Sequence, residues 1–180
     1  WIPESVAWLD QADGLQPRDG VVLQEEARAI QSRHETTKDA MKSVRMLRRR
    51  ELLRTAMASM LDAITLQQTA AALTTITEVT IQATLRAVRR EVVPPEDNDL
   101  DFSVIAMGRF GGAELTFGSD ADVMFIYDPN GVDSQRAHEL SLQLVAKLRE
   151  HSEDHRVPLE LDADLRPEGR SGPMVRSYAA

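Results

Sequence analysis

The pattern of apolar residues changes at one place in this chain, and the change limits the folds open to it. Before residues 92–99, which read Val-Val-Pro-Pro-Glu-Asp-Asn-Asp, apolar side chains recur every three or four residues, as in an amphipathic helix. After this segment, apolar runs of six residues end near glycine or proline, as short strands do. The prolines end the helical pattern because proline lacks a backbone N–H. The sequence therefore predicts an α+β fold, with a helical region over residues 1–95 and a second domain over residues 96–180.

The same spacing predicts the individual elements. In the first part we expect two helices between Val21 and Ile64, broken near residues 34–39, and then one long helix. That helix covers residues 66–92, and its apolar stripe includes Leu66 and Leu73. In the second part the order is strand, glycine turn, strand, helix and strand. The expected ranges are 102–107 and 122–127 for the first two strands, 132–153 for the helix and 157–165 for the last strand.

Composition removes several classes of function. The chain has no cysteine, which excludes disulfides, thiolate metal sites and cysteine nucleophiles. No apolar run reaches membrane-spanning length and no signal-peptide pattern opens the chain, so we expect a soluble cytoplasmic protein with no membrane partner. The start at Trp1 and the end at Ala180 carry no terminal pattern, which we interpret as a fragment of a longer polypeptide. Residues 96–180 hold 8 basic and 17 acidic side chains, a net charge of −9 that disfavours nucleic acid as a partner.

Two carboxylates stand one residue apart at the start of an expected strand. Asp120 and Asp122 would share a face there, because side chains two apart on a strand point the same way. A third carboxylate, Asp162, lies in the last expected strand, where it alternates with apolar residues as Asp164 does. Three carboxylates from neighbouring strands are hard oxygen ligands that suit Mg²⁺ or Mn²⁺. Such a cage can hold two metal ions for an in-line phosphoryl displacement.

The residues around the carboxylates fit phosphate chemistry. A glycine-rich turn precedes them, and its glycines let backbone N–H groups approach phosphate oxygens without a Cβ in the way. Ser119 adds a hydroxyl donor, and Arg166 can balance the charge of a triphosphate. The turn glycines are Gly108, Gly111 and Gly112. An aspartate at a strand start is often only a turn residue, and a glycine turn is ordinary, so it is the combination that favours a site.

Two motifs carry a resemblance to a known family. They are Gly108-x-x-Gly-Gly-x-Glu-Leu115, followed after four residues by Asp-x-Asp, and Asp162-x-x-Leu-Arg-Pro-x-Gly-x-x-Gly172. They resemble those of the bifunctional glutamine synthetase adenylyltransferase/adenylyl-removing enzymes, over residues 102–176. The segment from Leu15 to Arg54 is similar to the helical region ahead of the second core in that family. The resemblance implies a nucleotidyltransferase core like that of DNA polymerase beta, here cut short at its C-terminal end.

The resemblance also implies roles for single residues. Asp120 and Asp122 match the metal-binding pair, and Asp162 matches the third carboxylate. Asp164 stands where other members often have arginine. The wider superfamily has a small residue in place of Arg109, so phosphate contact falls to Gly111, Gly112 or Ser119.

Family members carry two such cores, and the resemblance leaves their reactions open for this chain. The favoured reading is transfer of AMP from ATP to a tyrosine of glutamine synthetase, which controls nitrogen assimilation. One alternative is phosphorolytic removal of that AMP by the same kind of core. Another is an inactive fragment that serves as an interaction module. Mg²⁺ or Mn²⁺ is the implied cofactor, and a PII-type signal protein is an implied partner through regions outside this chain.

Overall fold

A computed structural model describes residues 5–11 and 13–178, so Trp1 and Ala180 lie outside it. It divides into two compact units that share one long helix. The helical unit comprises Trp1–Ala83 and Ala113–Ser119, and the sheet unit comprises Thr84–Gly112 and Asp120–Ala180. The division at residues 95 and 96 expected from the sequence stays a prediction. No helix within the described ranges is long and apolar enough to span a bilayer.

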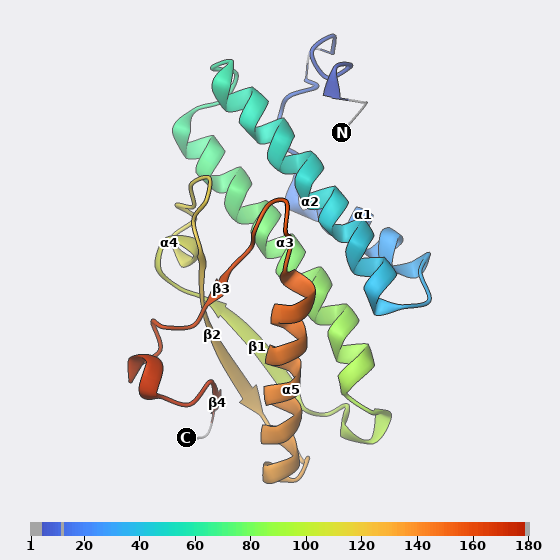
Figure 1. The fold of residues 1–180 in the computed structure, drawn as a ribbon, viewed down its shortest axis with the longest axis vertical. Helices are drawn as coiled ribbons and strands as arrows, with labels where there is room; N and C mark the ends of the chain where they lie inside the picture. The colour runs from blue at the N-terminus through green and yellow to red at the C-terminus, as the bar shows by residue number, and fades with distance from the viewer. Residues whose placement is uncertain (1–4, 12, 179–180) are drawn as a thin grey trace. The chain divides into compact units, whose positions relative to one another are not determined.

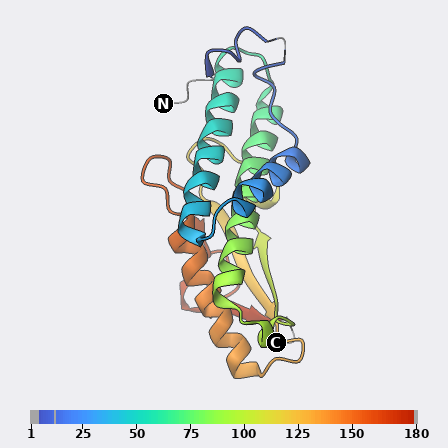
Figure 2. The same ribbon diagram turned by 90° about the vertical axis from the view of Figure 1, so that its right-hand side faces the viewer.

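The helical unit contains α1 (Gly20–Ser32), α2 (Thr37–Met60) and the first part of α3 (Leu66–Val92). Figures 1 and 2 both show α2 and α3 side by side. The helices begin where the sequence offers caps, since the Asp19 side chain accepts from the Val21 N–H and Thr36 accepts from the Asp39 N–H. The predicted break between the first two helices and the predicted long helix are both confirmed.

The apolar stripe of α3 starts later than the sequence suggests. Leu73, Ile76 and Val79 are buried, each at most 4% exposed. Leu66, expected in the same stripe, is 73% exposed, so that expectation is wrong. It is the first residue of α3, and the connection before it is exposed at residues 61–63 and 65. The spacing of apolar residues predicts which face of a helix a residue lies on. Whether that residue is buried also depends on another element packing over the same turn.

A network of ion pairs joins α1 to α2 inside the helical unit. Glu51 is only 2% exposed, and Arg50 and Arg54 donate to its two oxygens at 2.7 and 3.1 Å. Arg50 also grips Glu26 of α1 with two hydrogen bonds of 2.8 Å. A hydrogen bond from Arg18 at 2.6 Å completes the set. The hydrogen bonds that Glu26 accepts, first from Arg50 and then from Arg18, hold the pKa of Glu26 below its usual 4.5.

The sheet unit is built around β2 (Ala121–Asp128). β1 (Asp101–Ala106) pairs with β2 in the antiparallel sense along its whole length. β3 (Leu161–Asp162) and β4 (Val175–Ser177) both pair with β2 in the parallel sense, at its start and nearer its end. One turn of helix, α4 (Gly108–Gly111), follows β1. The α+β class predicted from the sequence is confirmed.

A long helix, α5 (Ser134–Ser152), covers one face of this sheet. It packs against β2 and β4, and Figure 2 shows it running along the strands. The helical spacing predicts Leu140, Leu144, Ala146 and Leu148 in the core, and the three leucines are indeed at most 1% exposed. The prediction is wrong for Ala146, which is exposed because a residue two positions from Leu144 lies about 200° around the helix. Burial alternates along β2, where every second residue from Ala121 is buried and the residues between are only half-buried.

The last expected strand, over residues 157–165, is mostly wrong. Only Leu161 and Asp162 pair with β2. Pro158 has no N–H for a ladder, and the Asp164 N–H donates to the Asp162 side chain at 2.8 Å instead of to a strand. β4 and the helical turn α4 are additions that the apolar pattern did not indicate. Short η turns at Pro95–Asp97 and Gly169–Ser171 complete the unit.

Candidate nucleotidyl-transfer site

Two of the predicted carboxylates come together where β2 and β3 begin to pair. Asp122 and Asp162 are register partners on these parallel strands, so their backbones lie ~4.8 Å apart and their side chains point to the same face. That face is the less buried face of β2, away from the alternate residues that form the core. Asp120 stands one residue before β2 and is exposed. The strand register thus accounts for two of the three expected ligands.

The glycine turn is close to this pair. Gly108 begins α4 with a φ of +49°, a conformation that glycine adopts without strain. A Cβ at this position would collide with the carboxylate of Asp122. The Met107 N–H also donates to the Asp122 carbonyl at 2.8 Å, which ties the turn to the strand. The backbone of Gly108 therefore lies directly against the Asp122 carboxylate, and its contact with a nucleotide stays a prediction.

The other glycines of the turn have different surroundings. A Cβ at Gly111 would come within 2.7 Å of the Ala106 carbonyl oxygen, so close packing of α4 on β1 requires glycine here. Gly112 caps α4 and is exposed. A phosphate contact by either backbone stays a prediction.

Ser119 belongs to the segment that clusters with the helical unit. Its hydroxyl accepts from the Thr116 N–H at 3.1 Å and lies 2.8 Å from the Thr116 hydroxyl. The hydroxyl therefore closes its own turn. Its predicted contact with a nucleotide stays a prediction.

Asp164 lies in a turn, which corrects the expectation that it shares a strand face with Asp162. Its N–H binds one oxygen of Asp162, and its carboxylate accepts from Arg170 Nε at 2.6 Å. The Arg170 side chain is 88% exposed. The ion pair with Asp164 raises the pKa of Arg170 above its usual value, chiefly through that hydrogen bond.

Arg166, expected at the triphosphate, is turned into its own loop. Its side chain is 6% exposed. Its three nitrogens donate to three backbone carbonyls, those of Ala163 at 2.7 Å, Arg170 at 2.9 Å and Gly172 at 3.1 Å. Nucleotide binding by Arg166 stays a prediction, and Arg170 is the more exposed cation of the same loop.

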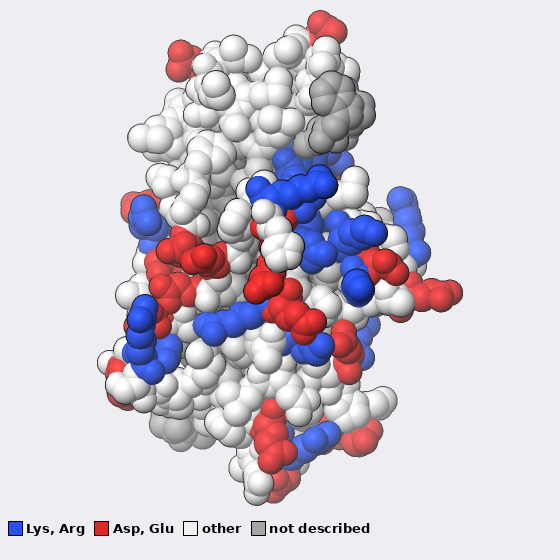
Figure 3. Space-filling model, in the orientation of Figure 1, with Lys and Arg blue, Asp and Glu red and all other residues white. Residues whose placement is uncertain are grey.

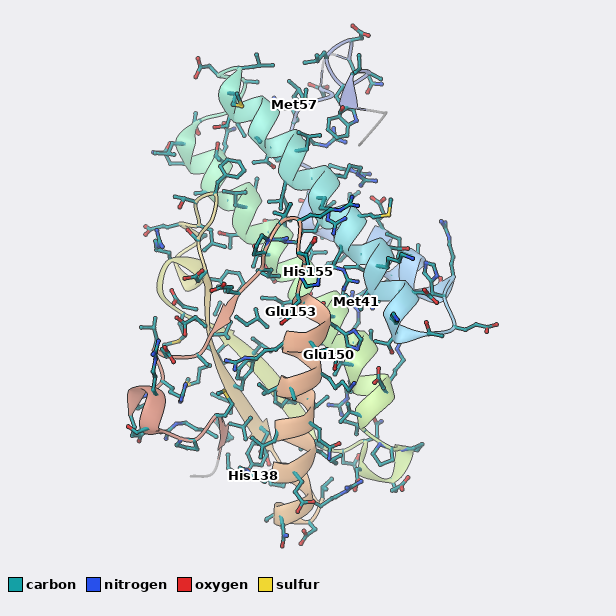
Figure 4. The ribbon with its side chains drawn as sticks, in the orientation of Figure 1. Met41, Met57, His138, Glu150, Glu153 and His155 are labelled. Atoms are coloured by element: carbon teal, nitrogen blue, oxygen red, sulfur yellow. The ribbon has the colours of Figure 1, made fainter. Side chains whose placement is uncertain are left out.

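A pocket of about 390 Å³ opens beside the third carboxylate. Sequence reasoning missed the part of its lining that comes from the end of α5. Arg149 and Glu153 belong to that end, and Figure 4 shows Glu153 there, with His138 at the other end of the helix. Arg149 donates to the Leu161 carbonyl at 3.3 Å, which fixes α5 to β3. The lining consists of Arg149, Glu153, Leu159, Glu160, Leu161, Asp162, Asp164 and Arg170.

The donor set suits a hard divalent cation, although the full cage is not assembled. Carboxylate oxygens are the ligands that Mg²⁺ and Mn²⁺ prefer, and Asp122 and Asp162 supply them from paired strands. Across residues 5–11 and 13–178, no three acidic or histidine side chains are grouped closely enough to form a metal cluster. A metal site of three carboxylates including Asp120 therefore stays a prediction.

Charge on the surface is mixed. On the face drawn in Figure 3, acidic and basic side chains lie interspersed and do not form one continuous basic area.

Known proteins resemble this chain over nearly its whole length. The family model of glutamate-ammonia ligase adenylyltransferase matches residues 3–180. Three relatives share the description bifunctional glutamine synthetase adenylyltransferase/adenylyl-removing enzyme. The one from Leifsonia xyli is 43% identical over 98% of the chain, that from Streptomyces coelicolor 41% over 97%, and that from Mycobacterium tuberculosis strain H37Rv 44% over 84%.

These relatives are much longer proteins. The chain spans 17% of the length of the Leifsonia protein, 19% of the Streptomyces protein and 16% of the Mycobacterium protein. The family model covers both units, including the carboxylates and the glycine turn. The chain therefore belongs to the glutamate-ammonia ligase adenylyltransferase family.

Proposed function

We propose that this chain carries a nucleotidyltransferase site that transfers AMP from ATP to a tyrosine of glutamine synthetase. The observation that carries the proposal is the register of Asp122 with Asp162, beside a glycine turn that leaves room for the Asp122 carboxylate. The relatives are named for the adenylylation of glutamine synthetase, which supports this protein substrate and this type of reaction. A PII-type signal protein would act through parts of the longer protein.

The proposed chemistry divides among a few residues. Asp120, Asp122 and Asp162 would hold Mg²⁺ or Mn²⁺, which when bound neutralises triphosphate charge and lowers the pKa of an attacking hydroxyl. Asp162 is the proposed base, because a tyrosine hydroxyl has a pKa near ~10 and gives up its proton slowly at neutral pH. Arg170 is the more exposed cation of the loop next to Asp162, and its guanidinium is paired with Asp164 at 2.6 Å. Positioning and charge neutralisation supply most of the catalysis in phosphoryl transfer.

Phosphorolytic removal of AMP is the second candidate. The relatives are named for both reactions, and the same carboxylates would serve either one. The attacking group then is inorganic phosphate in place of the tyrosine hydroxyl. The two reactions can be separated by incubating the 180-residue chain with unmodified glutamine synthetase and ATP, and separately with adenylylated glutamine synthetase and phosphate.

A third candidate is a non-catalytic interaction module. The absence of a grouped metal cluster among the described residues favours it. It predicts that the chain folds and binds glutamine synthetase without binding a metal–nucleotide complex.

Calorimetry with ATP tests the proposed site first. We expect ATP to bind in the presence of Mg²⁺ and not in its absence, and we expect Asp122→Asn to abolish that binding. Asp128→Asn is the matched control, because Asp128 ends the same strand on the same face, far from β3. Equal binding by wild type and Asp122→Asn, or none by either, would refute the site and leave the interaction module as the better reading.

A further inference from the structure

We infer that Arg166 is a positioning residue that orients the third carboxylate, Asp162, through the loop that follows it. The inference rests on the proposed function, because it assigns a role to the loop next to a proposed metal ligand. The sequence suggested that Arg166 balances the charge of a triphosphate. The hydrogen bonds of Arg166 point inward instead.

The guanidinium is the centre around which the loop closes. Its three donations reach carbonyls at both ends of the loop, Ala163 on one side and Arg170 and Gly172 on the other. The Gly169 N–H donates back to the Arg166 carbonyl at 2.7 Å. A planar fork with fixed donors can make this set of bonds, whereas the point charge of lysine cannot reach three carbonyls in the same way. Burial makes the set costly to lose, because an unpaired guanidinium would remain in the interior.

The closed loop reaches Asp162 by a short chain of contacts. Arg166 holds the backbone of Arg170, and the side chain of Arg170 grips the carboxylate of Asp164 at 2.6 Å. The backbone N–H of Asp164 then donates to Oδ1 of Asp162 at 2.8 Å. Arg166 Nη1 also lies 3.7 Å from Asp164 Oδ1. One oxygen of Asp162 is thereby fixed, and the other remains available for a ligand.

This arrangement explains why a buried arginine follows the carboxylate so closely. Asp162 is the last paired residue of a two-residue strand, so the ladder alone gives its side chain little support. The loop supplies that support from the other side. Without it, the Asp162 carboxylate would rotate freely at the edge of the sheet, and the register with Asp122 would fix only the backbone.

The backbone amide of Asp164 gives a readout that is independent of metal and activity. In the 180-residue chain we expect Arg166→Lys to speed hydrogen exchange of the Asp164 N–H by roughly tenfold or more, since the bond to Asp162 opens locally. The amides of Met124 and Ile126 in β2, which face β1, should stay protected, which shows that the sheet remains folded. Arg136→Lys is the matched control, because Arg136 is an exposed arginine of α5 whose side chain pairs with Asp97. It should leave the Asp164 amide unchanged.

A second variant covers the case in which Arg166→Lys fails to fold. Gly172→Ala keeps the buried guanidinium and places a Cβ 2.8 Å from a Glu168 carboxylate oxygen and 3.0 Å from the Glu168 Cβ, beside the carbonyl that accepts from Arg166 Nε, and we expect the crowding against that Cβ to disturb this hydrogen bond. It should accelerate the same amide to a smaller extent. Unchanged Asp164 exchange in every variant that folds would overturn the inference.

Titration with Mn²⁺ and a non-hydrolysable ATP analogue separates this inference from the proposed function. If the site works as proposed, wild type binds two Mn²⁺ per nucleotide and Arg166→Lys loses the one that depends on Asp162. Two Mn²⁺ with unchanged affinity in Arg166→Lys would overturn the positioning role. No Mn²⁺ in wild type would refute the proposed function, while the exchange of the Asp164 amide would still decide the role of Arg166.

Discussion

At the scale of single residues, Gly108 decides how closely the glycine turn approaches the strand that carries Asp122. Gly108→Ala would place a methyl group where the Asp122 carboxylate lies and would also strain a backbone with a φ of +49°. We expect a loss of about 2–4 kcal/mol in the free energy of unfolding, from strain and displacement together. Metal-dependent ATP binding should disappear in calorimetry.

A matched glycine separates the collision from the strain. Gly131, in the turn between β2 and α5, has a φ of +99°, and a Cβ there would meet nothing within 4 Å. Gly131→Ala should therefore show only the backbone penalty, about 1–2 kcal/mol, and retain ATP binding. Equal loss of ATP binding in both variants would contradict the role of Gly108.

The ion pairs of Glu26 make the stability of the helical unit depend on pH. Arg50 and Arg18 lower the pKa of Glu26 in the folded state below its usual 4.5. A lowered folded pKa means that the stabilisation is complete above the unfolded value and is lost as pH falls through the folded value. The difference in unfolding free energy between wild type and Glu26→Gln should therefore be constant near neutral pH and shrink below about pH 4.5. Urea denaturation over that range measures it, and a difference that grows with acid would contradict the assignment.

At the scale of elements, two leucines of α3 test where its core face begins. Leu73 is 3% exposed and Leu66 is 73% exposed. Leu73→Ala should cost about 2–5 kcal/mol because it leaves a cavity in the helical unit. Leu66→Ala should change the unfolding free energy by about 0.5 kcal/mol or less. Thermal and chemical denaturation of the pair, with the same change in the same helix, isolates burial from helix propensity.

The helices could be predicted from the sequence because each contains its own signals. Asp19 and Thr36 cap their helices, and the helix that ends at Val92 meets Pro94 two residues later. The short strands could not be predicted as well. β3 and β4 exist only because β2 offers its edge, and nothing in two or three residues records that partner. From the sequence, the Asp164 N–H could donate either to a neighbouring strand or to a side chain. In the folded loop it donates to the Asp162 side chain.

For the candidate site too, the sequence predicts some residues, whereas the roles of others depend on the fold. Alternation predicted that Asp120 and Asp122 share a face, and the motif around Asp162 predicted a third carboxylate. The strand register brings Asp122 and Asp162 together, while their role as metal ligands stays a prediction. The roles of Arg166 and Arg149 depend on atoms that the fold brings from other segments, the loop carbonyls for one and the β3 backbone for the other. An arginine in a phosphate-chemistry motif is expected to face phosphate, and its burial is visible only in three dimensions.

At the scale of the whole molecule, the distribution of charge argues against nucleic acid as a substrate, although polymerases share the type of core that the resemblance implies. Residues 96–180 carry a net charge of −9, and the whole chain carries −8. Aromatic side chains that could stack on bases amount to only 4% of the residues. Binding to single-stranded DNA or RNA needs a basic groove that releases counterions, so its strength falls steeply with salt.

We therefore expect no shift of a labelled oligonucleotide in gel electrophoresis at about 0.15 M salt, and only weak binding at low salt. The same preparation should bind ATP with Mg²⁺, which shows that the carboxylates are competent. A variant with Glu139→Lys and Glu150→Lys tests whether the acidic charge of residues 96–180 is what prevents oligonucleotide binding, because both positions are exposed on α5. Added positive charge should raise non-specific binding at low salt without changing ATP binding. Tight oligonucleotide binding by wild type at about 0.15 M salt would show that the acidic surface does not exclude phosphate backbones, and would revive a polymerase-like substrate for this site.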